Sequence, residues 1–191
     1  CSPLPLEVRK AYAISEVATV TSLGSGNIND TFVVKEGVQR FVLQRMSSHV
    51  FPEPLGVIRN FTTAARHIIQ KASDAGIAYR CAEPVMTSGG EYGCEDGQGC
   101  WWRAQSYLSH LSAESVSLTV ETAGQLGRTL ACFHHLTCDL EPSHLSDPIP
   151  LFHNTPAYLS QYDRVLASGR ERVSEEREEL RLATNLVATL R

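Results

Sequence analysis

The sequence predicts an α+β fold, in which an antiparallel sheet covered by one helix is followed by a mostly helical region. The first observation is that three strand-like runs follow one another with only short turns between them, over residues 15–23, 30–35 and 39–46. The second is that the apolar residues between Val57 and Ala72 recur at helical spacing. Because such a sheet needs cover on one face, we expect this helix to pack on the strands.

The remaining elements follow in order along the chain. Two further strand-like runs, near residues 83–88 and 99–107, bring the predicted sheet to five strands. Three more helices are expected after them, over residues 118–137, 155–167 and 172–190. This change of pattern predicts a first domain over residues 1–108 and a second domain, of which residues 109–191 are the beginning.

The turn between the first two strands contains Gly24 and Gly26. Glycine adopts positive φ freely, and without a Cβ its backbone N–H groups can approach an anion closely. A hairpin turn with a bulge uses the same residues, so the pair alone leaves both interpretations open. Because a strand and not a helix follows, the pair does not indicate a βαβ dinucleotide-binding fold.

The composition is that of an ordinary globular protein: of 191 residues, 42% are hydrophobic and 20% charged. The net charge of −4, with no basic block before the last predicted helix, argues against a nucleic-acid partner. No apolar run approaches the roughly 20 residues that span a membrane, and the first residues lack the pattern of a signal peptide. We therefore expect a cytoplasmic protein with no membrane partner.

Six cysteines are present, and none forms a Cys-x-x-Cys pair, so a zinc site is not expected. Cys94 and Cys100 flank a turn at Asp96 and Gly97 and could face each other across a hairpin. A disulfide and a pair of free thiols both remain open there, although a cytosolic chain keeps its thiols reduced.

Several short motifs occur in a fixed order along nearly the whole chain. They occupy residues 24–31, 41–46, 50–52, 59–60, 102–103 and 149–156. Together these motifs resemble the aminoglycoside-phosphotransferase-like superfamily, which has a protein-kinase-like fold. Within it, the chain looks most like the N-acetylhexosamine 1-kinases.

The resemblance implies that residues 1–108 form a small, nucleotide-binding lobe and that residues 109–191 begin a helical large lobe. It implies an enzyme, a phosphotransferase with an alcohol group as acceptor. ATP would be the phosphoryl donor, and the acceptor would be the anomeric hydroxyl of an N-acetylhexosamine sugar. Such proteins mostly position the reactants and neutralise charge, and Mg²⁺ is the metal that assists them.

The same resemblance implies which residues contact the phosphates. The loop of Gly24, Ser25 and Gly26 would lie over them. Kinase folds usually carry a lysine on the third strand, and here the matching residue is Gln44, whose amide can donate a hydrogen bond but brings no charge. Strand alternation puts Gln44 and its neighbour Arg45 on opposite faces of the sheet, and Arg45 is the alternative contact.

The base of the nucleotide would be held further along the sheet. Val42 would pack on the adenine ring, and backbone groups near Tyr107 and Leu108 would pair with its edge. Simple core filling is the alternative interpretation for Tyr107.

Five residues match family positions at the acceptor. Asn27 stands where the family usually has histidine, while Asn29 and Thr31 match the family and would order the loop or reach the acceptor. His153 and Asn154 resemble a Phe-His-Asp-Thr element, with asparagine in place of aspartate. Asn29 is also a common turn residue, and Asn154 precedes a predicted helix start, so a helix N-cap is the alternative there.

The family takes its catalytic base and Mg²⁺ ligands from a His-x-Asp-x-Lys-x-x-Asn-type loop and a later aspartate, and nothing after Asn154 matches that loop. The chain also begins at Cys1 rather than at methionine. We therefore expect a segment of a longer kinase, with no catalytic or metal-binding residue of its own. Two alternatives remain: a kinase-like binding module without catalysis, and a kinase for another small hydroxylated acceptor, such as an amino alcohol or an aminoglycoside.

Overall fold

The computed structural model describes residues 4–24, 28–109 and 116–168. The chain forms two compact units, residues 1–149 and residues 150–191. The lobe boundary expected after residue 108 is a different division and stays a prediction, and the helix expected over residues 172–190 lies outside the described residues.

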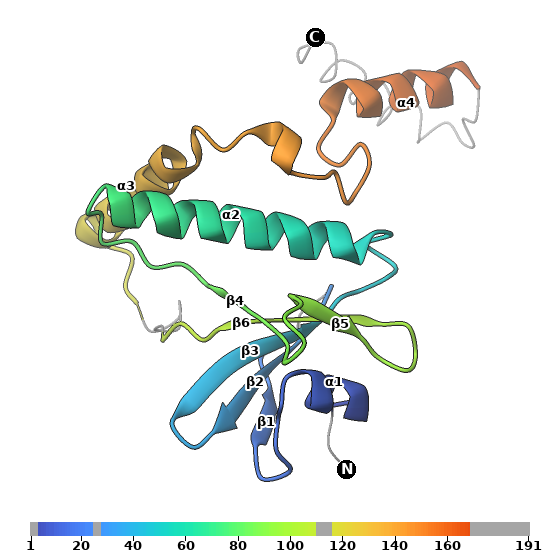
Figure 1. The fold of residues 1–191 in the computed structure, drawn as a ribbon. Coiled ribbons are helices and arrows are strands. Elements are labelled where there is room, and N and C mark those ends of the chain that lie inside the picture. The colour runs from blue at the N-terminus through green and yellow to red at the C-terminus, as the bar shows by residue number, and fades with distance from the viewer. Residues whose placement is uncertain (1–3, 25–27, 110–115, 169–191) are drawn as a thin grey trace. The chain divides into compact units, whose positions relative to one another are not determined.

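The first unit contains one antiparallel sheet (Figure 1). Its strands are β1 (Thr19–Ser22), β2 (Asp30–Glu36), β3 (Gln39–Arg45), β4 (Pro84–Val85), β5 (Gly93–Glu95) and β6 (Trp101–Ser106). The order across the sheet is β1-β2-β3-β6-β4, and β5 also pairs with β6. The sheet has six strands, one more than predicted, because the short β5 was not expected. Since β4 and β5 pair with successive parts of the same edge of β6, the sheet is five strands wide.

The described helices are α1 (Leu6–Ala11), α2 (Pro54–Asp74), α3 (Val120–Thr137) and α4 (Thr155–Ala167), with a short 3₁₀ turn at Pro142–His144. The long α2 starts with a proline in its first turn, where the missing N–H costs nothing. The N-terminus of α3 is closed by a capping box between Thr119 and Thr122. No helix in the described part of the chain is long and apolar enough to cross a membrane.

One face of the sheet carries the larger core of the first unit. Its central side chains, Val34, Leu43 and Trp102, are almost completely buried and pack with residues of α1 and of the segment before β1. The sequence pattern missed α1 because the helix has six residues, of which Val8 alone is buried. In Figure 1, α1 and α2 lie on opposite sides of the sheet.

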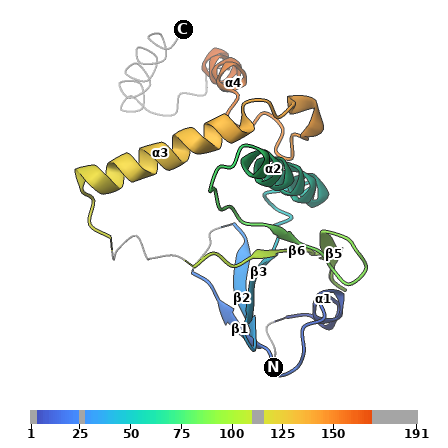
Figure 2. The same cartoon turned by 60° about the vertical axis from the view of Figure 1, so that its left-hand side comes forward.

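The other face of the sheet is covered by α2, which in turn packs against α3 (Figure 2). Ile68 and Ala72 of α2 form a small core with Leu136 of α3. At the N-terminal end of α2, Ile58 comes so close to β5 that a Cβ on Gly93 would lie 2.7 Å from the Ile58 Cδ1 atom. Glycine at this position therefore lets the helix approach the sheet.

A buried carboxylate closes the turn between β5 and β6. Asp96 Oδ1 accepts the backbone N–H groups of Gln98 and Cys100, each at 2.9 Å, and Asp96 Oδ2 accepts Nε1–H of Trp102 at 2.8 Å. Burial raises the pKa of Asp96, but these three hydrogen bonds together with the charge of Arg45 outweigh it, so the pKa lies below its usual value.

The pairing considered for Cys94 and Cys100 does not form, and both thiols are free. The reason is the register, because Cys94 lies opposite Trp102 on β6. Burial raises the pKa of Cys94 to about 11, which keeps this thiol protonated.

The second unit is described through α4 and the turn before it. Asn154 is the N-cap of α4, and its Oδ1 accepts the backbone N–H of Ala157 at 3.0 Å. The preceding residue, His153, has a φ of +57°, and its backbone N–H donates to the Tyr158 hydroxyl at 3.0 Å. The helix occupies the residues that the sequence predicts.

Candidate functional site

The glycine loop joins two antiparallel strands, as predicted. The backbone N–H of Leu23 donates to the Thr31 carbonyl at 2.8 Å, which closes the loop just beyond the β1–β2 pairing. Gly24 has a φ of +72°, and a Cβ there would meet no atom within 4 Å, so backbone conformation and not crowding favours glycine. Ser25, Gly26 and Asn27 lie outside the described residues.

Asn29 ties the far end of this loop to the strand beside it. Its Oδ1 accepts the backbone N–H of Ser47 at 2.9 Å, just after the end of β3. The side chain therefore links the start of β2 to the end of β3, and its predicted roles in the loop or at the acceptor stay predictions.

A row of hydrogen-bonded side chains runs across three strands at the base of the loop. Thr31, Gln44 and Arg103 are direct cross-strand neighbours on β2, β3 and β6. Gln44 donates from Nε2 to Thr31 Oγ1 at 3.2 Å. Its Oε1 accepts from Arg103 Nε at 3.0 Å and from Arg103 Nη2 at 2.9 Å. We call these three residues the polar row.

Arg103 is the charged member of the polar row. Its guanidinium carbon lies 4.7 Å from the centre of the Phe61 ring on α2, a cation–π distance. Burial lowers the pKa of Arg103 below its usual value. Within residues 4–24, 28–109 and 116–168, the ion pairs join other groups, and no carboxylate pairs with Arg103.

Arg45, the alternative to Gln44, lies on the opposite face of the sheet. Its Nη2 atom is 2.6 Å from Asp30 Oδ2, and both side chains are about half exposed. The structure therefore separates Arg45 from the polar row and leaves Gln44 in it, as the alternation of strand residues predicts.

The residues proposed for the adenine lie toward the other end of β6. Val42 shares a face with Gln44 and is 7% exposed. Tyr107 and Leu108 follow β6 and line a cavity of about 450 Å³ with the C-terminal part of α2. Arg40 lies over the Tyr107 ring at 5.7 Å from its centre.

The acceptor residues of the prediction fall in both units. Asn29 and Thr31 belong to the glycine loop and the polar row of the first unit, whereas His153 and Asn154 precede α4 in the second unit. Because Asn154 Oδ1 caps α4, the helix-cap interpretation holds for it.

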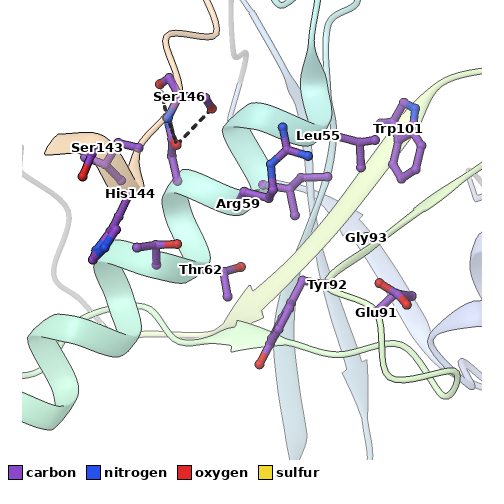
Figure 3. Close-up of a pocket in the computed structure, with 14 residues that line it drawn as sticks. Leu55, Arg59, Thr62, Glu91, Tyr92, Gly93, Trp101, Ser143, His144 and Ser146 are labelled. Atoms are coloured by element: carbon purple, nitrogen blue, oxygen red, sulfur yellow. Dashed lines mark hydrogen bonds between the residues drawn. The ribbon is translucent and has the colours of Figure 1, made fainter. Parts of the chain in front are cut away.

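A separate pocket of about 690 Å³ lies between the N-terminal half of α2, the β5–β6 hairpin and residues 143–146 (Figure 3). Apolar walls come from Leu55, Ile58 and Trp101. The Thr62 hydroxyl also lines it and is buried without a hydrogen-bond partner. Arg59 and Asn60, which form one of the short motifs of the sequence, also line this pocket, whereas the predicted nucleotide and acceptor residues do not.

The acidic residues do not form a metal site in the part of the chain that the structure describes, where no cluster of three His, Cys, Asp or Glu side chains could hold an ion. Asp139 instead joins α2 to the end of α3, through Lys71 Nζ at 2.6 Å and His67 Nε2 at 3.1 Å. The described residues thus do not fit Mg²⁺.

The contact between Arg103 and Gln44 was not expected from the sequence, although residues 102–103 form one of its motifs. The available signal was the pairing of β3 with β6, since that register places Arg103 directly beside Gln44. The alternation of residues along one strand shows which face each residue occupies. It does not show which residue on the neighbouring strand lies next to it.

A sheet five strands wide, a long helix on one face and a glycine loop between its first two strands define a protein-kinase-like small lobe. The profile of the phosphotransferase enzyme family matches residues 19–191. The chain belongs to this family.

Two solved structures show the same fold. A spectinomycin phosphotransferase, in complex with ADP and spectinomycin, matches with a TM-score of 0.51 at 14% identity, over 91% of this chain and 50% of that one. A microcompartment-associated aminopropanol kinase matches with a TM-score of 0.50 at 14% identity, over 83% of this chain and 54% of that one. The chain thus spans about half the length of these relatives.

Proposed function

We propose that the complete protein is an ATP-dependent kinase of a small hydroxylated molecule, and that residues 1–108 supply its nucleotide-binding lobe. The observation that carries the proposal is the glycine loop closed between two antiparallel strands, with the polar row at its base. Backbone N–H groups of such a loop can bind phosphate oxygens without any side chain between them. Membership of the phosphotransferase family supports the same activity.

In this proposal the triphosphate lies under residues 24–26, and Gln44 donates or accepts hydrogen bonds at the edge of that site. Val42 and the backbone near Tyr107 and Leu108 hold the base. The ligands of Mg²⁺ and the base that deprotonates the acceptor belong to residues other than those the structure describes.

For the acceptor we propose an N-acetylhexosamine, phosphorylated at its anomeric hydroxyl. The support is the order of the motifs that resemble the N-acetylhexosamine 1-kinases. Asn27, Asn29, Thr31 and His153 are the proposed acceptor contacts, and Asn154 holds the helix that follows. An amino alcohol or an aminoglycoside is the alternative acceptor. The two similar structures, a spectinomycin phosphotransferase and an aminopropanol kinase, support this alternative.

The test is ATP consumption by the complete protein with a panel of acceptors. The panel contains N-acetylglucosamine, N-acetylgalactosamine, 1-amino-2-propanol and spectinomycin, with phosphorus NMR to identify the product. We expect turnover with an N-acetylhexosamine and a sugar 1-phosphate as product. Turnover with another acceptor alone would reject the sugar assignment, and no nucleotide binding at all would reject the kinase.

A further inference from the structure

We propose that Arg103 is the cation that contacts the nucleotide phosphates, and that Gln44 acts by aiming it. The proposal rests on the kinase function proposed above and names the residue that supplies positive charge at that site. In protein kinases this charge comes from a lysine on the third strand, whereas here the third strand carries an amide and the neighbouring strand carries the cation.

The geometry fixes the guanidinium in one place. Gln44 Oε1 takes two of its N–H groups, and the Phe61 ring lies against its flat side. Arginine has five N–H donors, so three donors remain for a ligand. A side chain held from two directions loses little further freedom when it binds an anion.

The charge balance indicates what that ligand is. A half-buried cation is costly unless an anion compensates it, and no described carboxylate pairs with Arg103. Its contacts are with a neutral amide and an aromatic ring, neither of which carries a negative charge. A phosphate oxygen would supply the missing charge and fits the fork of N–H groups.

The position relative to the glycine loop agrees with this ligand. Thr31 is the second residue of β2, just after the loop, and Arg103 lies two strands away in the same row. Two strand spacings amount to about 10 Å, which an extended arginine and a triphosphate together can bridge. Both residues lie on the face that α2 covers, so Arg103 does not have to cross the sheet.

The choice of glutamine at position 44 follows from the same arrangement. A lysine there would place a second cation beside Arg103, whereas the glutamine carbonyl accepts from Arg103 and its amino group donates to Thr31. A neutral acceptor at position 44 therefore suits a cation at position 103. A lysine at position 44 should therefore restore part of the ATP affinity that is lost when Arg103 is replaced by a neutral residue.

The experiment measures dissociation constants of ATP and of adenosine for the complete protein, by titration calorimetry. We expect Arg103→Gln to raise the dissociation constant of ATP by at least about tenfold, the size of a lost charge-assisted contact. The dissociation constant of adenosine should change by less than about twofold. The double variant Gln44→Lys with Arg103→Gln should bind ATP more tightly than Arg103→Gln alone. The matched control is Arg66→Gln, which removes the same charge from an exposed position on α2.

If Arg103→Gln does not fold, as judged by its thermal unfolding, Gln44→Glu provides the second test. A carboxylate at position 44 would pair with Arg103 and neutralise it, so ATP binding should fall while the fold persists. Equal losses for ATP and adenosine, or no loss for ATP, would overturn the proposal and leave the kinase intact. A wild-type protein that binds neither compound would overturn the proposed function and this inference with it.

Discussion

The two faces of the central sheet differ in what their side chains do. On the face toward α1, Val34, Leu43 and Trp102 are buried in the larger core. On the face toward α2, the same three strands carry Thr31, Gln44 and Arg103, joined by hydrogen bonds. Neighbouring residues such as Leu43 and Gln44 thus belong to different environments.

This difference separates stability from binding within one set of strands. Burial of apolar side chains supplies most of the free energy of folding, and the face toward α1 provides it. The face toward α2 can then hold a polar row whose net contribution to stability is small. Substitutions on the two faces should therefore give different phenotypes.

The sharpest comparison is between two adjacent positions on β3. Leu43 is completely buried, and Leu43→Ala should lower the free energy of unfolding by about 3 kcal/mol, through lost burial and the cavity left behind. Gln44→Ala should cost about 1 kcal/mol, the net value of a hydrogen-bonding group. Urea denaturation of both variants measures the two values. Similar costs at both positions would contradict the division between the faces.

A second comparison concerns a buried carboxylate in contact with the apolar face, that of Asp96. Asp96→Ala should lower the free energy of unfolding by about 2 kcal/mol, because it leaves the buried Trp102 N–H without an acceptor. Asp96→Asn keeps one acceptor oxygen and should cost less. Tryptophan fluorescence during denaturation follows both variants, and an unaffected Asp96→Ala protein would show that the turn does not depend on the carboxylate.

The smallest effect is expected where α2 meets the end of α3. The hydrogen bonds from Lys71 and His67 lower the pKa of Asp139 from 3.8 to about 2. A group whose pKa is lower in the folded state stabilises the fold above its unfolded pKa, and this contribution disappears as the pH falls toward 2. Because Asp139 is exposed, solvent and salt screen the effect and keep it small.

The corresponding measurement compares wild type with Asp139→Asn in urea, near neutral pH and at a pH close to 2. Wild type should be the more stable protein near neutral pH, and the two should converge at the acidic end. If the two proteins differ in free energy of unfolding by the same amount at both pH values, the effect of the substitution does not come from the charge of Asp139.

Much of the fold follows from local patterns in the sequence. The glycine loop, the first three strands and the long α2 all have short-range signals in the form of turns, alternation and helical spacing. The three residues of β5 and the six of α1 are too short to show any period. The N-cap at Asn154 was one of two interpretations that the sequence offered, and the structure shows that cap.

The candidate site was less predictable because its key contacts join distant strands. Alternation alone separated Gln44 from Arg45, and the structure agrees. The contact between Gln44 and Arg103 joins residues 59 positions apart, and no local pattern encodes it. Roles that depend on cross-strand neighbours need the strand order and the register, which come only with the structure.

The polar row also restricts how β3 can pair with β6 while the chain folds. Slipping one strand by a single residue would turn its side chains to the other face, and would bring Arg103 against the apolar core without an acceptor. Misaligned pairings of these two strands are therefore penalised in free energy, and the correct alignment is favoured. The guanidinium that we propose for nucleotide binding would thereby also favour the correct register of β3 and β6 during folding.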